Sequence, residues 1–374
     1  MVYFDNSATS FPKPVSVRRA CETALERYGA NPGRSGHALS VETAKKVYEV
    51  RNLAAGMFGA QPENVAFTPN CTFALNMAIK GMMQYGGHII ISPYEHNSSA
   101  RPAFRLTQTA GVRLSVFEMG RDDEQTLKNI RSLIRSDTKC VCVTAASNVT
   151  GRLMPIREIA ALCKSEGICC IVDGAQACGV VPLSLADGMN FICAAGHKGL
   201  YGPTGTGLLI SDGEYALSTI IEGGTGVTSA QLEQTADMPE RLESGTLNTV
   251  GILGLGEGIR FVRRKGTEVI QAHEEGLCRR FIEGIKGIRG VRLYETDVPR
   301  APIVAFNIGE RHSEETAKLL GDRGYALRGG LQCAPLAHRA IGTLGQGVVR
   351  FSPSAFNSVR QTEALIMAVR AVRI

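Results

Sequence analysis

The chain has 374 residues, of which 44% are hydrophobic and 20% charged, and its formal net charge is +6. At roughly 100–200 residues per domain, this length predicts two or three domains. No apolar run approaches the roughly 20 residues that a membrane span needs, and the N-terminus has no signal-peptide pattern. Lys and Arg are scattered and Trp is absent, so we expect neither a membrane protein nor a nucleic-acid-binding surface.

The sequence contains eleven cysteines, and several lie inside apolar, strand-like runs, as Cys140 and Cys142 do. A disulfide framework is typical of short secreted chains with many loops, which this chain is not. The cysteine spacing also lacks the pattern of a zinc site. We therefore expect a cytoplasmic protein without a metal site, in which most cysteines are small buried hydrophobic residues.

Short apolar strands alternate with helices of about 10–15 residues over the first 250 residues, a pattern typical of a parallel sheet covered on both faces. The expected helices are residues 15–28, 41–58 with Ser40 as N-cap, 72–84, 122–134 and 155–166. The expected strands are residues 88–92, 112–117, 139–144, 168–172, 191–195 and 207–211. The sequence therefore predicts an α/β fold.

The pattern changes near residue 250, where long helices and a few shorter strands predict an α+β unit. The expected helices are residues 251–265, 268–285, 313–323 and 361–372. The expected strands are residues 291–294, 303–308 and 348–352. We expect a long helix, without a flexible linker, at the boundary between the two units.

Polar side chains follow four of the strands expected in the first unit. They are His96, Asn148, Asp173 with Gln176, and His197 with Lys198. Because parallel strands direct their carboxyl ends to one edge of the sheet, these side chains should share a cleft. A carboxylate at the end of an apolar strand needs a partner, and a Lys in such a place can form a Schiff base once its pKa is lowered. The alternative is a structural ion pair between Asp173 and Lys198.

Three segments around these residues resemble the pyridoxal-phosphate site of class V aminotransferases. They are Val-Asp-Gly-Ala-Gln (172–176), Gly-His-Lys (196–198) and Gly-Pro-Thr-Gly-Thr-Gly (202–207). Within that class the chain resembles the group II, selenocysteine-lyase-like cysteine desulfurases, nearly end to end. The resemblance implies fold type I, with a mainly parallel seven-stranded sheet, and a homodimer. It also implies an N-terminal segment at the active site (1–14), a large cofactor domain (15–250) and a small C-terminal domain (251–374).

The resemblance implies roles for individual residues at a pyridoxal 5'-phosphate cofactor. Lys198 forms the Schiff base, Asp173 pairs with the pyridine nitrogen and Gln176 hydrogen-bonds the phenolic oxygen. His96 stacks on the ring and moves protons, and Asn148 is a further cofactor contact. The phosphate contacts are Thr72 at a helix start, His197, and Thr246 in the site of the partner subunit. Ala195 stands where the family usually has a Ser donor, and Cys71 is a candidate replacement.

A second motif, Arg-Gly-Gly-Leu-Gln-Cys (328–333), places Cys333 five residues after Arg328 on a glycine-rich loop. In the family this cysteine takes the substrate sulfur as a persulfide. Gln332 stands where relatives often have His, which removes a possible base. The resemblance further implies a substrate-carboxylate clamp at Arg350, because a guanidinium binds a carboxylate in a bidentate manner. The other expected substrate contacts are Asn148, Arg328, Arg34 and His37.

The function implied is a cysteine desulfurase that converts L-cysteine to L-alanine and passes the sulfur to an acceptor protein. A selenocysteine lyase, or another C–S lyase or aminotransferase on this fold, would use the same site and need Cys333 less. A non-catalytic, cofactor-binding regulatory scaffold is the alternative of another class. Residue by residue, Cys333 could be an incidental loop cysteine, Arg350 a surface residue, and Arg34 and His37 part of a solvated loop.

Overall fold

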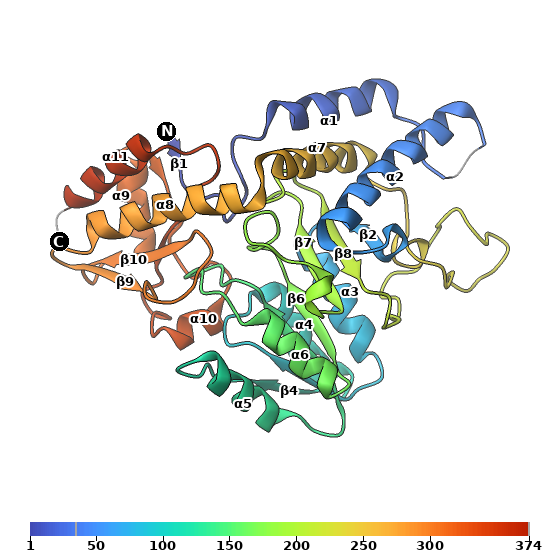
Figure 1. Ribbon diagram of the computed structural model, residues 1–374, viewed down its shortest axis with the longest axis horizontal. Helices are drawn as coiled ribbons and strands as arrows, with labels where there is room; N and C mark the ends of the chain where they lie inside the picture. Colours follow the sequence, from blue (N-terminus) through green and yellow to red (C-terminus); the bar gives the residue numbers. More distant parts are fainter. Residues whose placement is uncertain (34–35, 373–374) are drawn as a thin grey trace.

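The computed structural model describes residues 1–33 and 36–372, and a seven-stranded sheet lies at its centre (Figure 1). Its strand order is β2-β8-β7-β6-β5-β3-β4. The strands are β2 (Val65–Thr68), β3 (His88–Ile91), β4 (Arg113–Val116), β5 (Thr138–Thr144), β6 (Cys169–Asp173), β7 (Phe191–Ala195) and β8 (Gly207–Ser211). All neighbours pair in parallel except β8, which is antiparallel to both β7 and β2. The predicted α/β fold is confirmed, and the sheet is mixed.

The central strands are buried on both faces, as their apolar sequences predict. In β5, Cys140 and Cys142 face one hydrophobic core, while Val141 and Val143 face another on the opposite side of the sheet. Nine of the eleven cysteines are buried, Cys21 is half-buried and Cys333 is exposed. Most cysteines therefore act as small core residues, and Cys333 differs from all the others in exposure.

Helices cover both faces of this sheet (Figure 1). They are α1 (Val15–Arg27), α2 (Ala38–Phe58), α3 (Cys71–Met83), α4 (Asn97–Thr109), α5 (Asp123–Leu133), α6 (Ile156–Ser165) and α7 (Thr249–Lys265). The sequence analysis missed α4, because Pro102 lies inside a polar stretch, and it missed the short strand β2. No helix in the described part of the chain is long and apolar enough to cross a membrane.

The start of α2 differs from the prediction. The helix begins at Ala38, and the N-cap is His37, whose side chain accepts a hydrogen bond from the Ser40 amide. Ser40 lies inside the first turn, where its hydroxyl donates to the main-chain oxygen of Asn31. The expected Ser40 cap was therefore wrong, because an imidazole nitrogen satisfies the free amide in its place.

A smaller antiparallel sheet, in the order β12-β10-β9, forms the second unit. Its strands are β9 (Val291–Tyr294), β10 (Val304–Ile308) and β12 (Val349–Phe351), and its helices are α8 (Thr267–Ile285), α9 (Ser313–Gly321), α10 (Pro335–Ala340) and α11 (Val359–Arg370). The N-terminal strand β1 (Val2–Tyr3) pairs in parallel with β11 (Tyr325–Ala326) of this unit. Phe4 is fully buried in its core, so the two ends of the chain pack together (Figure 1).

Candidate active site

A hollow lies where β5, β6 and β7 end. The hollow brings together eight residues that the sequence analysis placed in one site: Cys71, Thr72, His96, Asn148, Asp173, Gln176, His197 and Lys198. They converge because parallel strands direct their carboxyl ends to a single edge of the sheet.

Asp173 is the last residue of β6 and is buried, with 2% of its surface exposed. Its Oδ1 accepts a hydrogen bond from the Ala175 amide at 2.9 Å. The Cys71 thiol lies 3.5 Å from the same oxygen and 3.3 Å from the main-chain oxygen of Cys193. The thiol is therefore turned toward Asp173. This orientation does not support the prediction that Cys71 replaces the missing Ser as a donor to the phosphate.

Lys198 follows β7 and belongs to the same hollow. Burial lowers the pKa of its amine below the ordinary value of 10.5, although the Asp173 carboxylate opposes this shift. A lowered pKa increases the fraction of neutral amine, which is the form that attacks a carbonyl carbon. Lys198 thus has the electrostatic setting of a nucleophilic lysine.

The N-terminal segment holds the main chain on either side of the Lys198 side chain. The Ser10 hydroxyl donates to the Lys198 main-chain oxygen at 2.9 Å, and the Thr9 hydroxyl donates to that of His197 at 3.1 Å. Lys13 Nζ donates to the His197 oxygen at 2.7 Å, and burial lowers the pKa of Lys13 to about 8. The sequence analysis did not identify Lys13, because nothing in its local pattern indicates a contact 184 residues away.

His96 caps the N-terminus of α4. Its Nδ1 accepts from the Ser98 amide at 3.0 Å and lies 2.9 Å from the Ser98 hydroxyl. Burial lowers the pKa of the imidazole to about 4, and the cations Lys198, Arg328 and Arg350 contribute to this shift. The ring is therefore neutral near pH 7, with Nδ1 bonded to its own helix and Nε2 left for the hollow.

Glu95, next to His96, is a fully buried carboxyl group that the sequence analysis did not assign. It accepts hydrogen bonds from the hydroxyls of Ser92 and Ser99 and from the Thr144 amide. Burial raises its pKa to about 7, and the Asp173 carboxylate contributes to the shift. These bonds join the loop that carries His96 to the end of β5.

One end of the hollow has the features of an anion site. It is lined by Thr72 in the first turn of α3, where the first backbone amides have no partner within the helix. His197 Nδ1 lies at the same hollow and is a buried nitrogen without a hydrogen-bond partner in the described structure. Ala195 also lines it and adds no donor. An unpartnered buried nitrogen fits a site that a phosphate completes.

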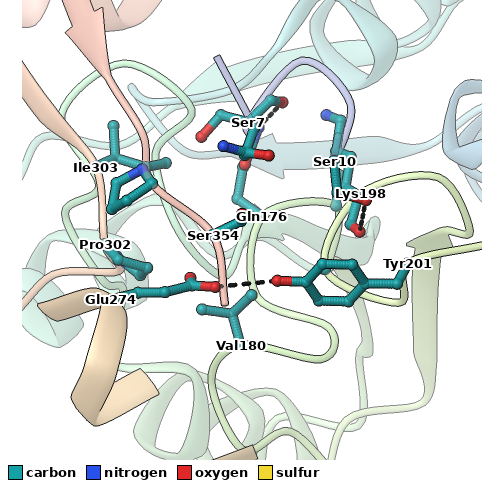
Figure 2. Close-up of a pocket in the computed structure, with 14 residues that line it drawn as sticks. Ser7, Ser10, Gln176, Val180, Lys198, Tyr201, Glu274, Pro302, Ile303 and Ser354 are labelled. Carbon is teal, nitrogen blue, oxygen red and sulfur yellow. Dashed lines mark hydrogen bonds between the residues drawn. The ribbon is translucent and has the colours of Figure 1, made fainter. Parts of the chain in front are cut away.

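Gln176 lines this hollow and also a second one, which Figure 2 shows. Its Nε2 donates to the main-chain oxygen of Ser7 at 3.0 Å, which fixes the amide beside the N-terminal segment. The second hollow also contains Glu274 of α8, which accepts a hydrogen bond from the Tyr201 hydroxyl at 3.2 Å (Figure 2). Only 3% of Glu274 is exposed, and burial raises its pKa from 4.5 to about 8.

Replacement of Glu274 by Gln should change how stability depends on pH. The folded protein holds a proton on Glu274 up to about pH 8, while the unfolded chain releases it near 4.5, so wild-type stability falls as pH rises between these values. Each pKa unit corresponds to about 1.4 kcal/mol, so Glu274→Gln should gain up to roughly 4 kcal/mol on wild type across this range. Urea unfolding at fixed protein concentration, from about pH 5 to pH 8, measures the gain.

The matched control is Glu268→Gln, because Glu268 lies on the same helix and is exposed. The difference in free energy of unfolding between the Glu268→Gln variant and wild type should change little with pH. An equal pH dependence of the two variants would contradict the assignment of a protonated carboxyl group to Glu274.

Arg350 of β12 is almost completely buried beside the hollow, with 1% of its surface exposed. Nη1 donates to the main-chain oxygen of Asn148 at 2.9 Å, and Nη2 pairs with Asp5 at 2.6 Å. Nε is buried without a partner in the described structure. Arg350 is thus a core residue of the site, and its ion pair with Asp5 was not predicted, because the two positions are 345 residues apart.

The loop before α10 presents Cys333 to solvent. Gln332 and Cys333 both have left-handed backbones, with φ of 42° and 57°, a conformation that costs non-glycine residues about 1–3 kcal/mol each. The Cys333 oxygen accepts from the Asn97 amide at 2.8 Å, next to His96, and Arg328 Nη2 lies 3.8 Å from the Cys333 sulfur. These contacts place the Cys333 loop against the start of α4, next to His96, which lines the hollow.

Gln332 is buried and holds this loop in place. Its Nε2 donates to the Val348 oxygen at 2.8 Å, and its Oε1 lies 3.1 Å from His338 Nε2. Asn148 Nδ2 donates to the Gln332 main-chain oxygen at 2.7 Å, while Asn148 Oδ1 is buried without a partner. Gln332 therefore holds the loop in place, and the imidazole of His338 lies six residues further along the chain.

Two predicted residues lie apart from the hollow of this subunit. Thr246 is exposed, and its hydroxyl accepts from Asn31 Nδ2 at 3.5 Å. His37 is exposed and caps α2. Arg34 lies outside the described residues.

Comparisons with known proteins agree with this geometry. The aminotransferase class-V family pattern matches residues 2–365. A probable cysteine desulfurase of Xylella fastidiosa is 30% identical over 100% of this chain and 91% of its own length, and one of Pyrococcus abyssi is 31% identical over 98% and 92%. The apo structure of a cysteine desulfurase from Thermococcus onnurineus superposes with a TM-score of 0.89 at 32% identity, covering 99% of this chain and 94% of that one.

The chain belongs to the class-V aminotransferase family. Enzymes of this family generally depend on pyridoxal phosphate, and the hollow offers what such a cofactor needs: a lysine with a lowered pKa, a buried carboxylate and an anion site. The residues present therefore fit the cofactor of the class-V aminotransferases.

Proposed function

We propose that the chain is a pyridoxal-phosphate-dependent cysteine desulfurase that converts L-cysteine to L-alanine and receives the sulfur on Cys333. One observation carries the proposal: the loop of the exposed Cys333 is bonded to the residue that follows His96, and His96 lines the hollow together with Lys198 and Asp173. The Asn97 amide, next to His96, donates to the Cys333 main-chain oxygen at 2.8 Å. The similarity to cysteine desulfurases over nearly the whole chain supports the same reaction.

The residues of the hollow divide between the two ends of the cofactor, which supplies an electron sink when bound. Lys198 would hold it covalently, and the Asp173 carboxylate would keep the ring nitrogen protonated. The amides of the first turn of α3, Thr72 and the free Nδ1 of His197 would hold the phosphate. Gln176 would have one N–H for the phenolic oxygen, since the other bonds Ser7.

Three side chains then act on the substrate. Arg350 orients the cysteine carboxylate through the guanidinium N–H groups that Asp5 and Asn148 leave free. Neutral His96 accepts and returns a proton at Nε2, and released Lys198 can do the same at Nζ. Cys333 attacks the substrate sulfur, and the Arg328 guanidinium lies 3.8 Å from the Cys333 sulfur.

The test is a direct product assay on the holoenzyme. Incubation with L-cysteine and a reducing thiol should release alanine and sulfide in equal amounts, and incubation with L-selenocysteine measures the preference between sulfur and selenium. Release of alanine from selenocysteine alone would make the protein a selenocysteine lyase. Release of pyruvate and ammonia in place of alanine would make it another C–S lyase.

We also expect a homodimer that shares its active sites. Thr246 is exposed and away from the hollow of its own subunit, so it can bind a phosphate only in the site of a second subunit. Sedimentation equilibrium should show a dimer, and Thr246→Ala should weaken cofactor binding by about tenfold, the effect of losing roughly one hydrogen bond to a charged group. A monomer that retains the cofactor would contradict this arrangement.

A further inference from the structure

One exposed stripe of α4 begins at Cys333. The Asn97 amide, in the first residue of α4, donates to the Cys333 main-chain oxygen. From there the exposed residues of the helix recur at helical spacing: Arg101, Phe104, Arg105 and Gln108. Because a helix advances about 5.4 Å per turn, this stripe leads away from the thiol over two to three turns.

The two segments that meet at Cys333, helix α4 and residues 328–348, carry positive charge, although the exposed Glu314 of α9 lies against Gly330 of the loop. Helix α4 contains Arg101 and Arg105 and no Asp or Glu, and residues 328–348 contain Arg328 and Arg339 and no Asp or Glu. Arg101, Arg105 and Arg339 are exposed. None of these four arginines forms an ion pair within residues 1–33 and 36–372.

Large apolar side chains are exposed on the same two segments. Phe104 of α4 is 58% exposed, Leu331 is 38% exposed two residues before Cys333, and Leu344 is 42% exposed in the turn that follows α10. Single exposed apolar residues are common, but aromatic side chains and arginines together are typical of the energetic centres of protein interfaces. We name Arg101, Phe104, Arg105, Leu331, Arg339 and Leu344 the arginine face.

We propose that the arginine face docks the protein that accepts sulfur from Cys333, and that this acceptor surrounds its reactive cysteine with acidic residues. The inference rests on the proposed function and names the partner of the same site. Charge complementarity selects the partner: four arginines that form no ion pair, against the one nearby carboxylate of Glu314, repel a basic protein and attract an acidic one. At physiological salt such attraction acts over about 8–10 Å and raises association rates by roughly 10- to 1,000-fold.

The transfer step itself needs no further reactant. The acceptor thiolate attacks the outer sulfur of the Cys333 persulfide, a new S–S bond forms on the acceptor, and the bond to Cys333 breaks. The electron pair of that bond stays on Cys333, which leaves as a thiolate beside Arg328, and the proton stays on the transferred sulfur. The reactants are the Cys333 persulfide and the acceptor thiolate, and the products are the acceptor persulfide and the Cys333 thiolate. The step therefore needs no oxidant or reductant.

The experiment uses the holoenzyme and two synthetic peptides of equal length, each with one cysteine, flanked in one by Asp and Glu and in the other by Lys. With radiolabelled cysteine sulfur on Cys333, transfer to the acidic peptide should be at least about tenfold faster at low salt. The advantage should disappear near 0.5 M salt, by screening. The double variant Arg101→Glu/Arg105→Glu should lose it, while turnover with dithiothreitol, a small neutral thiol, stays at the wild-type rate.

The matched control is Arg18→Glu/Arg19→Glu, which makes the same charge change at exposed positions of α1. It should keep the preference for the acidic peptide. Equal transfer to both peptides would overturn the docking proposal, and so would an equal loss of the preference for the acidic peptide in both double variants. In either case, turnover with dithiothreitol would still support the desulfurase function. Stronger competition by polyuridine RNA than by the acidic peptide would also overturn it, and absence of alanine release with dithiothreitol would overturn the proposed function itself.

Discussion

Replacement of Lys198 by Ala is expected to abolish both turnover and the visible absorbance of the bound cofactor. Lys198 is the amine in the hollow with a burial-lowered pKa, and it shares that hollow with the buried carboxylate of Asp173. Without the amine no covalent link to the cofactor can form. Absorbance spectra of the purified variant, recorded with added pyridoxal phosphate, and an alanine assay measure both losses.

Lys13→Ala is the matched control for this change. Lys13 is also a partly buried lysine with a lowered pKa, but its Nζ bonds the main-chain oxygen of His197. Its loss should leave the cofactor colour in place. If Lys198→Ala kept the colour and wild-type turnover, the whole assignment of the hollow would be wrong.

Replacement of Cys333 by Ala is expected to lower the rate of sulfur release from cysteine by several orders of magnitude, while the visible absorbance of the cofactor is retained. Cys333 is exposed and lies 3.8 Å from Arg328, whereas burial raises the pKa of the core cysteines, including Cys140, Cys178 and Cys193. Thiolates react and buried thiols do not. Alanine release from cysteine and from selenocysteine separates the reactions, because selenolate leaves more easily without a nucleophile.

Two further measurements identify the reactive thiol. Brief treatment with iodoacetamide should label Cys333 first, and mass spectrometry after exposure to L-cysteine should find one extra sulfur on that residue. Cys21→Ala is the control, because Cys21 is half-buried and burial raises its pKa. Desulfuration of cysteine at the wild-type rate by Cys333→Ala would leave Cys333 without a role and favour the lyase alternative.

The sequence alone was sufficient for the centre of the site. His96, Asp173 and Lys198 could be grouped because each follows an apolar strand, and the carboxyl ends of parallel strands meet at one edge. Most strands and most helices were found within a few residues, since alternation and helical periodicity are local, but the short strands β1, β2 and β11 were not. Helix α4 was missed because Pro102 and a polar composition hide its period.

The tertiary structure decided the features that depend on contacts between distant segments. Asp5 pairs with Arg350, strand β1 joins the C-terminal unit, and Lys13 reaches His197. No local pattern predicts these contacts, because each joins segments that lie far apart in the sequence. Tertiary packing also brings Asn97 against Cys333. The start of α4 therefore lies beside the reactive cysteine, although the two are far apart in the sequence. Short sequence motifs therefore identify the reactive residues of the site, while the packing of the chain determines which other residues contact them.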